Sequence, residues 1–497
     1  MYRLLIYVLM GMLTITVVLA SVGLIHYSPL SLVLSTIYIT FFCWITNVVF
    51  AKVFRAPINV ESVYITALIL VFLITPIQSF SDTNFYILGF WASVWAIASK
   101  FIFAIKKKHV FNPAAFGVAI PALFLGYSAS WWIGTTYLIV PAIIGAFLIT
   151  KKIRRFDLVG SFILTACLVI LIPHITGGAS GILKVLQSLF LSAPILFFAG
   201  VMLTEPLTTP PTKSLQIFYG ILVGVLFSPD IHIGSFYFTP EFALLIGNIF
   251  SYTVSPKEKL LLILKEKINI AQDTYDFVFT KNEPFRFVPG QYLEWTLAHT
   301  TPDNRGNRRY FTIASSPTEE TVRMGVKFYP EPSSFKKSLL SLSPGQTIIA
   351  SQRAGDFTLP KDTEKKLVFI SGGIGITPFR SMLKYLIDTH QKRDIVHFYS
   401  NKALPDIAYK DILDMAEREL GIKTVYTLTE KNTIPPEWHG ESGFIDKDMI
   451  VRHVPDFKER TFYLSGPHIM VTTFETLLKS MGVKKSQIIT DFFPGFA

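Results

Sequence analysis

The stretch Leu367-Val-Phe-Ile-Ser-Gly-Gly-Ile-Gly-Ile-Thr-Pro378 combines a short apolar run with a glycine-rich turn. The apolar run predicts a buried strand, and the amphipathic pattern over 378–389 predicts the helix that follows it. Glycines let a strand end turn tightly and let backbone N–H groups approach a phosphate. Thr377 suits a helix N-cap and Pro378 suits the first helical position. The stretch therefore predicts a nucleotide-binding turn between a strand and a helix.

Outward from this stretch, the same half of the chain predicts two domains. Strands at 395–399 and 423–427 follow at βαβ spacing, and several short alternating segments precede the turn. We expect an antiparallel β-barrel domain over 257–363 and a doubly wound α/β nucleotide-binding domain over 364–497.

The first half of the chain has a different composition. Hydrophobic residues make up 51% of the 497 residues and charged residues 16%, against about 25% charged in an average soluble protein. Residues 4–51 and 109–150 contain no charged residue, whereas the longest uncharged run after 257 has fifteen residues. This excludes a disordered, nucleic-acid-coating or single soluble-domain protein, and it predicts a polytopic α-helical membrane domain over 1–256.

A membrane-spanning helix needs ~20 mostly apolar residues. Ten segments meet or approach this length, and the shortest of them are candidates for half-helices or re-entrant pieces. The predicted spans are 4–25, 30–50, 59–77, 85–105, 113–127, 133–150, 156–174, 188–203, 214–228 and 240–254.

The basic residues between these spans predict the orientation. Ten spans place eleven of them on one face, together with the C-terminal half, and leave Lys184 on the other face. By the positive-inside rule, both termini and the C-terminal domains are cytoplasmic. We therefore expect an integral protein of a prokaryotic plasma membrane.

Metal and haem sites are not expected within the chain. Cys43 and Cys167 are too few for a zinc site, an iron–sulfur cluster or a disulfide framework. The histidines of the first half lie in loops or at span ends, and no two share a helix, as bis-histidine haem ligation requires.

Two stretches of the membrane half resemble a known family. Lys107-Lys-His-Val-Phe-Asn-Pro-Ala-Ala-Phe-Gly117 and Met202-Leu-Thr-Glu-Pro-Leu-Thr-Thr-Pro210 are similar to the Phe-Asn-Pro-Ala and Ala-Thr-Asp-Pro signatures of two related subunits. These are the B subunit of sodium-translocating NADH:quinone oxidoreductase and the D subunit of the Rnf complex. The segment Asn59-Val-Glu-Ser-Val-Tyr-Ile-Thr66 agrees with the same family.

The resemblance implies a flavin in the membrane domain that helps to pass electrons across the bilayer, coupled to ion movement. Members carry a covalently flavinylated threonine, which Gly177-Gly-Ala-Ser-Gly-Ile182 lacks. A non-covalent FMN or riboflavin is therefore expected, with Asn112, Thr204 and Glu205 as contacts. Independently of the family, Asn-Pro and Glu-Pro pairs break apolar helices beside polar groups. Alternatively, Glu205 lies at the membrane interface and the next proline ends a span.

In the soluble half, Arg308-Arg309-Tyr310-Phe311-Thr312-Ile-Ala-Ser-Ser-Pro317 resembles the Arg-x-Tyr-Ser/Thr flavin motif of ferredoxin–NADP reductase-type enzymes. The resemblance implies that Arg309 binds the FAD pyrophosphate, Phe311 stacks on the isoalloxazine and Thr312 hydrogen-bonds N5. An ordinary strand with a solvated arginine pair is the alternative. The expected FAD contacts are Arg309, Tyr310, Phe311, Thr312, Ser315, Lys327, Ser333 and Ser334.

The same resemblance implies a nicotinamide site. Ser465-Gly-Pro-His-x-Met470 stands where the family has Cys-Gly-Pro-Pro, so Ser465 replaces the cysteine beside the nicotinamide. With Thr312, the candidate catalytic residues are Ser465 and Phe496, an aromatic that would cover the flavin. NADH and NADPH both stay open. The expected nucleotide contacts are Gly372, Gly373, Gly375, Thr377, Gly466 and Pro467.

We therefore expect NAD(P)H to be oxidised at a cytoplasmic FAD and electrons to pass through the membrane domain to an extracytoplasmic flavoprotein or a quinone. The ~30 Å hydrocarbon core requires at least one intermediate carrier. The expected partners are a nicotinamide nucleotide, the lipid bilayer and the electron acceptor, with no nucleic acid. A membrane-anchored reductase of quinone or a soluble carrier, and a solute or ion transporter regulated by flavin redox state, stay open as alternatives.

Overall fold

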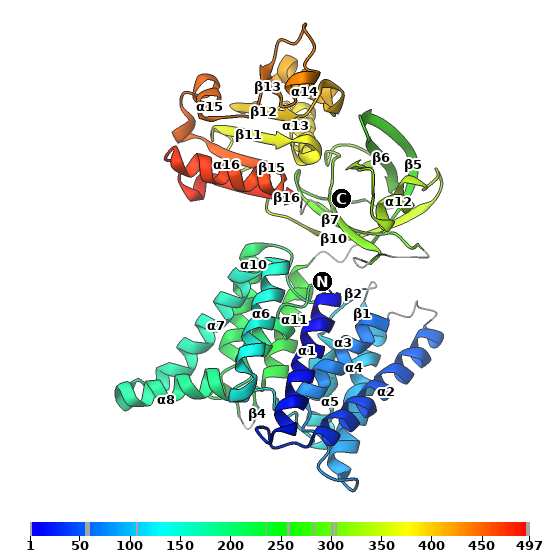
Figure 1. Cartoon of the computed structure of the whole chain (residues 1–497), viewed down its shortest axis with the longest axis vertical. Helices are drawn as coiled ribbons and strands as arrows, with labels where there is room; N and C mark the ends of the chain where they lie inside the picture. The colour runs from blue at the N-terminus through cyan, green and yellow to red at the C-terminus, as the bar shows by residue number, and fades with distance from the viewer. Residues whose placement is uncertain are drawn as a thin grey trace. The chain divides into compact units, whose positions relative to one another are not determined.

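The computed structural model describes residues 2–54, 60–105, 108–234, 236–255, 259–281, 284–299, 303 and 306–493. Two compact units make up the chain, Met1–Lys257 and Glu258–Ala497. Figure 1 shows the first as a bundle of helices and the second as a mixed α/β body. The candidate residue Phe496 and the motif residue Asn59 lie outside the described residues.

The first unit is helical. Its longer helices are α1 (Tyr2–Ser21), α2 (Pro29–Val53), α3 (Val60–Leu73), α4 (Thr83–Ile102), α5 (Pro113–Leu125), α6 (Ile139–Ile153), α7 (Phe156–Leu171), α8 (Gly178–Leu191), α10 (Lys213–Leu226) and α11 (Pro240–Val254). Within the described residues, five helices are long and apolar enough to cross a membrane, or six if one bent pair is a single span. Several apolar helices are therefore present, but ten full spans are not confirmed.

The span predicted over 188–203 is not one uninterrupted helix. Helix α8 ends at Leu191, and the chain resumes as α9 (Ile195–Phe197) and the π-helix η3 (Phe198–Met202). The two parts are bent by 56°. Pro194 lies at the break, and it has no N–H with which to continue the hydrogen bonds of α8. Short π-helical turns are frequent at functional sites.

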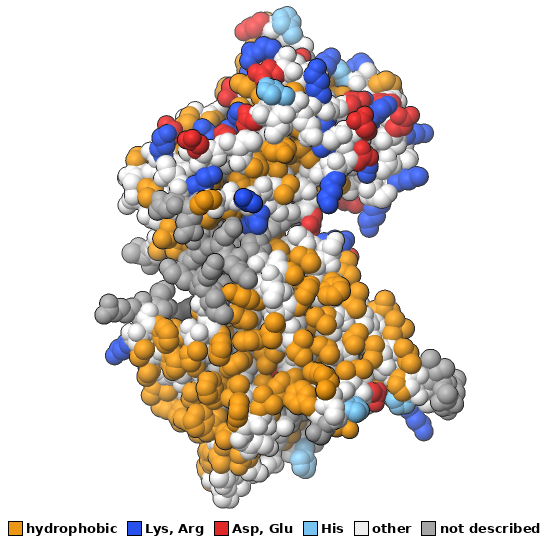
Figure 2. All heavy atoms as spheres, turned by 180° about the vertical axis from the view of Figure 1, so that it is seen from behind, with side chains coloured by type: hydrophobic (Ala, Val, Ile, Leu, Met, Phe, Trp, Pro, Cys, Tyr) orange, Lys and Arg blue, Asp and Glu red, His pale blue; other side chains and the backbone are white. Residues whose placement is uncertain are grey.

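The surface of the first unit is apolar. Figure 2 shows hydrophobic side chains covering its visible face, with few charges. Large side chains such as Phe124 and Val140 are 76% and 64% exposed. Soluble proteins rarely expose contiguous apolar surface on this scale, so this unit is suited to a lipid bilayer.

The second unit begins with a six-stranded antiparallel sheet in the order β8-β7-β10-β5-β6-β9. Ala314 N–H donates to the carbonyl of Arg323 at 2.9 Å, which joins the chain after β8 to β9. Among the described residues no ladder pairs β8 with β9, so a fully closed barrel is not confirmed. The elements are β5 (Lys259–Ala271), β6 (Thr274–Lys281), β7 (Tyr292–Thr296), β8 (Arg308–Thr312), β9 (Val322–Lys327), α12 (Ser334–Leu340) and β10 (Thr347–Ala354).

A six-stranded parallel sheet follows, in the order β14-β13-β12-β11-β15-β16. Helices α13 and α14 cover one face and α15 and α16 the other. The order in which the strands follow one another along the chain reverses between β11 and β15, and ligands bind at such a switch point, outside the carboxyl ends of the strands. The elements are β11 (Leu367–Gly372), α13 (Thr377–Asp388), β12 (Ile395–Asn401), α14 (Lys410–Leu420), β13 (Lys423–Leu428), β14 (Glu441–Ser442), α15 (Lys447–His453), β15 (Thr461–Pro467), α16 (His468–Ser480) and β16 (Ile488–Phe493).

Candidate functional site

The second unit holds an anion-binding cluster around Arg309 of β8. The guanidinium Nη2 donates to Asp303 Oδ1 at 3.1 Å. The backbone N–H of Ser334 donates to Asp303 Oδ2 at 3.2 Å, and Asp303 N–H donates to Ser334 Oγ at 2.8 Å. Ser333 caps α12 beside them. Carboxylate and phosphate oxygens accept from the same donors, so Arg309, Ser333 and Ser334 form a donor set that fits the pyrophosphate of FAD.

The rest of the predicted flavin motif divides between the two faces of β8. Alternation along a strand places Arg309 and Phe311 on one face, where Phe335 contacts both: its ring centroid is 5.3 Å from the guanidinium and 5.9 Å from the Phe311 ring. Tyr310 points the other way, and its hydroxyl donates to Glu294 at 2.9 Å. Thr312 ends the strand and is buried. Tyr310 is therefore not brought together with the Arg309 cluster.

Two further predicted FAD contacts are engaged elsewhere. The Ser315 hydroxyl accepts from Arg323 N–H at 3.2 Å and so stabilises the turn after β8. The Lys327 ammonium donates to Asp406 at 2.6 Å, on the α/β side of the unit. Neither side chain contacts the Arg309 cluster.

The glycine-rich turn lies at the switch point. A Cβ at Gly375 would be 2.3 Å from the carbonyl oxygen of Ser465, and one at Gly372 would be 2.2 Å from Met470 Sδ. Gly466 lies against Gly372. The structure therefore brings 372–375 and 465–467 into direct contact. Glycine is required at position 375, because a Cβ there would meet the backbone of Ser465 and Gly466.

The predicted N-cap role of Thr377 is wrong. A 3-10 turn, η4 (Gly373–Ile376), runs directly into α13, so Thr377 is already helical and Ile376 holds the cap position. The Thr377 hydroxyl instead donates to the carbonyl of Ile374 at 3.1 Å.

Beneath the turn lies a buried polar group that the sequence analysis missed. Ser371 Oγ and His397 Nε2 are hydrogen-bonded at 2.7 Å, and Ser371 pairs in register with Ser465. The Ser465 side chain is fully buried, and its Oγ has no partner in the part of the chain that the structure describes. An orphaned hydroxyl at the switch point fits a polar ligand such as the nicotinamide carboxamide. Only the strand register places these residues together.

Burial lowers the pKa of His397 to about 3, so the folded protein holds this imidazole neutral.

The membrane unit has its own buried polar cluster, at the start of α5. Asn112 caps this helix: its Oδ1 accepts from Ala115 N–H at 3.1 Å. Asn112 N–H donates to Asn248 Oδ1 at 2.7 Å, and Asn248 Nδ2 donates to the hydroxyl of Tyr219 at 3.0 Å. Asn248 and Tyr219 were not identified from the sequence, because both lie in helices remote in the chain.

The end of η3 meets this cluster. Asn112 Nδ2 donates to the carbonyl of Met202 at 3.4 Å. The Glu205 carboxylate accepts from the Thr208 hydroxyl at 3.3 Å. It also interacts with the Asn112 side chain through a hydrogen bond and with the Lys100 ammonium through its charge. The Thr204 hydroxyl is used within its own turn, donating to Gly200 at 2.7 Å. Asn112 and Glu205 are thus brought together.

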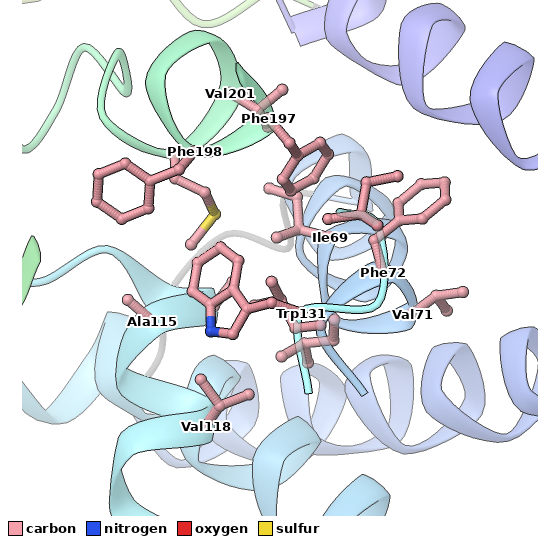
Figure 3. Close-up of a cluster of buried hydrophobic side chains, with 14 of the residues drawn as sticks. Ile69, Val71, Phe72, Ala115, Val118, Trp131, Phe197, Phe198 and Val201 are labelled. Atoms are coloured by element: carbon pink, nitrogen blue, oxygen red, sulfur yellow. The ribbon is translucent and has the colours of Figure 1, made fainter. Parts of the chain in front are cut away.

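An apolar cluster flanks these polar groups. Figure 3 shows Trp131 between Phe198 of η3 and side chains of α3, with Ala115 and Val118 of α5 beside it. The centroids of Trp131 and Phe198 are 5.8 Å apart, and the indole N–H donates to Glu241 at 2.9 Å. The membrane site therefore combines a polar edge with aromatic walls.

Known protein families match a part of each unit. Residues 369–476 match the family model described as the oxidoreductase NAD-binding domain, and residues 120–257 match the NQR2, RnfD, RnfE family. The chain therefore contains one segment similar to an oxidoreductase NAD-binding domain and one similar to the NQR2, RnfD, RnfE membrane family.

The following curated relatives each match less than half of the chain. The glycine betaine monooxygenase reductase subunit of Pseudomonas aeruginosa (strain UCBPP-PA14) is 27% identical over 46% of this chain and 63% of its own length. A flavohemoprotein of Bacillus cereus is 30% identical over 42% of this chain and 53% of its own. The chain thus spans between about half and two thirds of these curated relatives. The cytochrome b5 reductase domain of Ulva prolifera nitrate reductase aligns with a TM-score of 0.42 and 24% identity, over 48% of this chain and 98% of that one.

The contact between the glycine turn and β15 generates a first prediction. Gly375→Ala forces the turn away from Ser465, and we expect NAD(P)+ to bind at least about tenfold more weakly. Gly421→Asn is the matched control, because Gly421 lies after α14 and outside the turn, with φ +72° and no atom near its Cβ position, and asparagine tolerates this conformation. Titration calorimetry on the full chain measures both affinities. Equal affinities for the two variants would contradict the prediction.

The Arg309–Asp303 pair generates a second testable prediction. Because FAD has to displace the Asp303 carboxylate from Arg309, Asp303→Asn should bind FAD about fivefold more tightly, as expected for a partly exposed pair worth about 1 kcal/mol. Flavin-fluorescence titration of deflavinated protein measures the dissociation constant, with the exposed Asp362→Asn as control. Weaker binding by Asp303→Asn would show that the carboxylate assists FAD instead.

The buried His397 generates a third testable prediction. Its imidazole stays neutral in the folded protein down to about pH 3, whereas the unfolded chain takes up a proton near pH 6.5. Below pH 6.5 this one group therefore lowers the free energy of unfolding, by up to about 1.4 kcal/mol per pH unit. His397→Gln should flatten the fall in melting temperature between pH 6.5 and 4.5. If the melting temperatures of variant and parent fall equally with pH, the loss of stability is not caused by His397.

Proposed function

We propose that this chain is a transmembrane electron-transfer protein. NAD(P)H is oxidised at FAD in the second unit, and electrons pass through the membrane unit to an extracytoplasmic or quinone acceptor. The observation that carries the proposal is the fusion itself: one polypeptide joins a reductase-type nucleotide-binding unit to a membrane unit that contains a buried polar site at broken helices. A simple anchor requires no such site.

The second unit supplies binding and orientation. Arg309 and the Ser334 N–H would hold the FAD pyrophosphate in place of Asp303, Phe311 would pack against the isoalloxazine, and Thr312 would supply a hydrogen bond to it. FAD, when bound, converts a two-electron donor into a source of single electrons. The turn 372–375 takes the pyrophosphate of NAD(P)H, and the Ser465 hydroxyl orients the nicotinamide.

The membrane unit supplies the intermediate carrier that a ~30 Å hydrocarbon core demands. We assign a non-covalent FMN or riboflavin to the site edged by Asn112 and Glu205 and walled by Trp131 and Phe198. Amide and carboxyl groups suit the polar edge of an isoalloxazine, and aromatic rings suit its face. On this proposal, residues 258–497 and both termini are cytoplasmic.

Proteoliposomes test the proposal. The purified chain is reconstituted with ferricyanide trapped inside the vesicles, and NADH or NADPH is added outside. Because neither reagent crosses the bilayer, the proposal expects reduction of interior ferricyanide and two flavins per chain, FAD together with FMN or riboflavin.

Variants separate the membrane site from the reductase. Asn112→Leu should lose most of its interior reduction relative to its own rate with ferricyanide added outside. Asn47→Leu, the same change at another buried asparagine of this unit, is the matched control and should retain both rates. Rapid reduction of outside ferricyanide only, with a single FAD per chain, would refute transmembrane transfer and favour an anchored reductase.

A further inference from the structure

Arg380 is a buried arginine that none of the roles above uses. It lies in the first turn of α13, directly after the glycine-rich turn, and is 4% exposed. Its Nη1 donates to the carbonyl of Ala314 at 3.0 Å, and its two Nη atoms form a bidentate pair with Glu319. A buried arginine carries a large desolvation cost unless its partners are well placed, so this contact is specific.

The contact joins the α/β domain to the turn that follows the flavin strand. Ser381, next to Arg380, donates its hydroxyl to the carbonyl of Ser315 at 2.6 Å. Glu319 in turn accepts from Ser316 N–H at 2.6 Å. The first turn of α13 therefore holds three consecutive residues of this backbone, 314–316, beginning two residues after Thr312.

A second buried contact supports the same junction. Asp276 of β6 is fully buried, and it accepts from Arg323 at 2.8 Å and from the hydroxyl of Tyr409 at 3.1 Å. Burial and the Asp276 carboxylate raise the pKa of Tyr409 well above its usual value, so the phenol stays a donor. A Cβ at Gly325 would lie 2.5 Å from the Tyr409 oxygen, which shows how closely the two domains approach.

We propose that Arg380 is a positioning residue that couples the nucleotide turn 372–375 to the end of β8. Helix α13 begins at that turn, so a shift of α13 moves the nucleotide-binding backbone. Arg380 and Ser381 transmit the same shift to 314–316 and hence to Thr312. The inference rests on the proposed sites for FAD and NAD(P)H, and it assigns their mutual placement to a residue that touches neither ligand.

Hydrogen exchange provides a readout that does not depend on activity. NAD+ binding to the full chain in detergent should slow amide exchange over 314–319, although the nucleotide does not contact these residues. Arg380→Gln should abolish this protection while leaving the affinity for NAD+ within about threefold. Arg380→Lys keeps the charge but loses the bidentate geometry, and it should retain part of the protection.

Stopped-flow reduction of the bound flavin by NADH gives the second readout. A misplacement on the order of 1 Å can slow a reaction about 100-fold, and we expect Arg380→Gln to slow flavin reduction about 10- to 100-fold at saturating NADH. Glu319→Gln should slow it similarly, and the double variant should be no slower, because both changes remove one contact.

Arg460→Gln is the matched control. Arg460 is 7% exposed and pairs with Asp394 and Asp456 inside the α/β domain, so its loss perturbs folding without touching the flavin side. If Arg380→Gln and Arg460→Gln slow flavin reduction equally, or if protection of 314–319 persists in Arg380→Gln, the coupling role is overturned. Ser381→Ala, a milder change, should lose part of the protection if Arg380→Gln does not fold. Absence of flavin from the parent chain would instead refute the proposed function, so the two failures are distinguishable.

Discussion

The ion pair between Arg380 and Glu319 is shielded from water, and neither charge is tolerated there without the other. It joins α13, which packs on the parallel sheet, to the turn that follows β8 of the antiparallel sheet. Once formed, it holds the start of α13, and with it the glycine turn, at one distance from β8. The Asp276–Tyr409 contact repeats this arrangement from the other side. The geometry of the catalytic unit therefore depends on buried polar contacts between its domains as much as on either sheet.

The membrane unit meets a related constraint. In hydrocarbon every backbone N–H and C=O needs a partner within the protein, yet in this unit α5 begins only at Pro113, and the chain bends at Pro194 between α8 and α9. Side-chain amides satisfy two of the backbone groups near α5: Asn248 Oδ1 accepts from the Asn112 N–H, and Asn112 Nδ2 donates to the carbonyl of Met202. A backbone group whose hydrogen-bond partner is a side chain can exchange that side chain for a ligand. That is the physical basis for placing a cofactor there.

On the proposed function, the two units thus use different side-chain chemistry to bind a redox carrier. In this proposal, the second unit offers glycine backbone and a guanidinium to phosphate-bearing nucleotides, which are strongly charged and water-soluble. The membrane unit offers neutral amides, one carboxylate and aromatic rings, which suit a weakly charged aromatic carrier in an apolar medium. A chain that joins these two kinds of site is suited to taking electrons from a soluble donor and releasing them within or beyond a membrane.

The sequence by itself determined the features that depend on local sterics and local hydropathy. Long apolar runs specified the helices of the first unit, and the pattern around 367–378 specified a strand, a tight turn and a helix, because glycine and proline act on their own backbone. Where a residue's role depends on a partner distant in the chain, only the tertiary structure decided that role. Thr377 does not cap α13, because a 3-10 turn precedes it and already continues into the helix. The Lys327 ammonium binds Asp406, 79 positions away, and not the predicted cofactor site. Arg380, Asp303 and His397 carry no local signal, since what each does is set by a carboxylate, guanidinium or hydroxyl that only folding brings within hydrogen-bond distance.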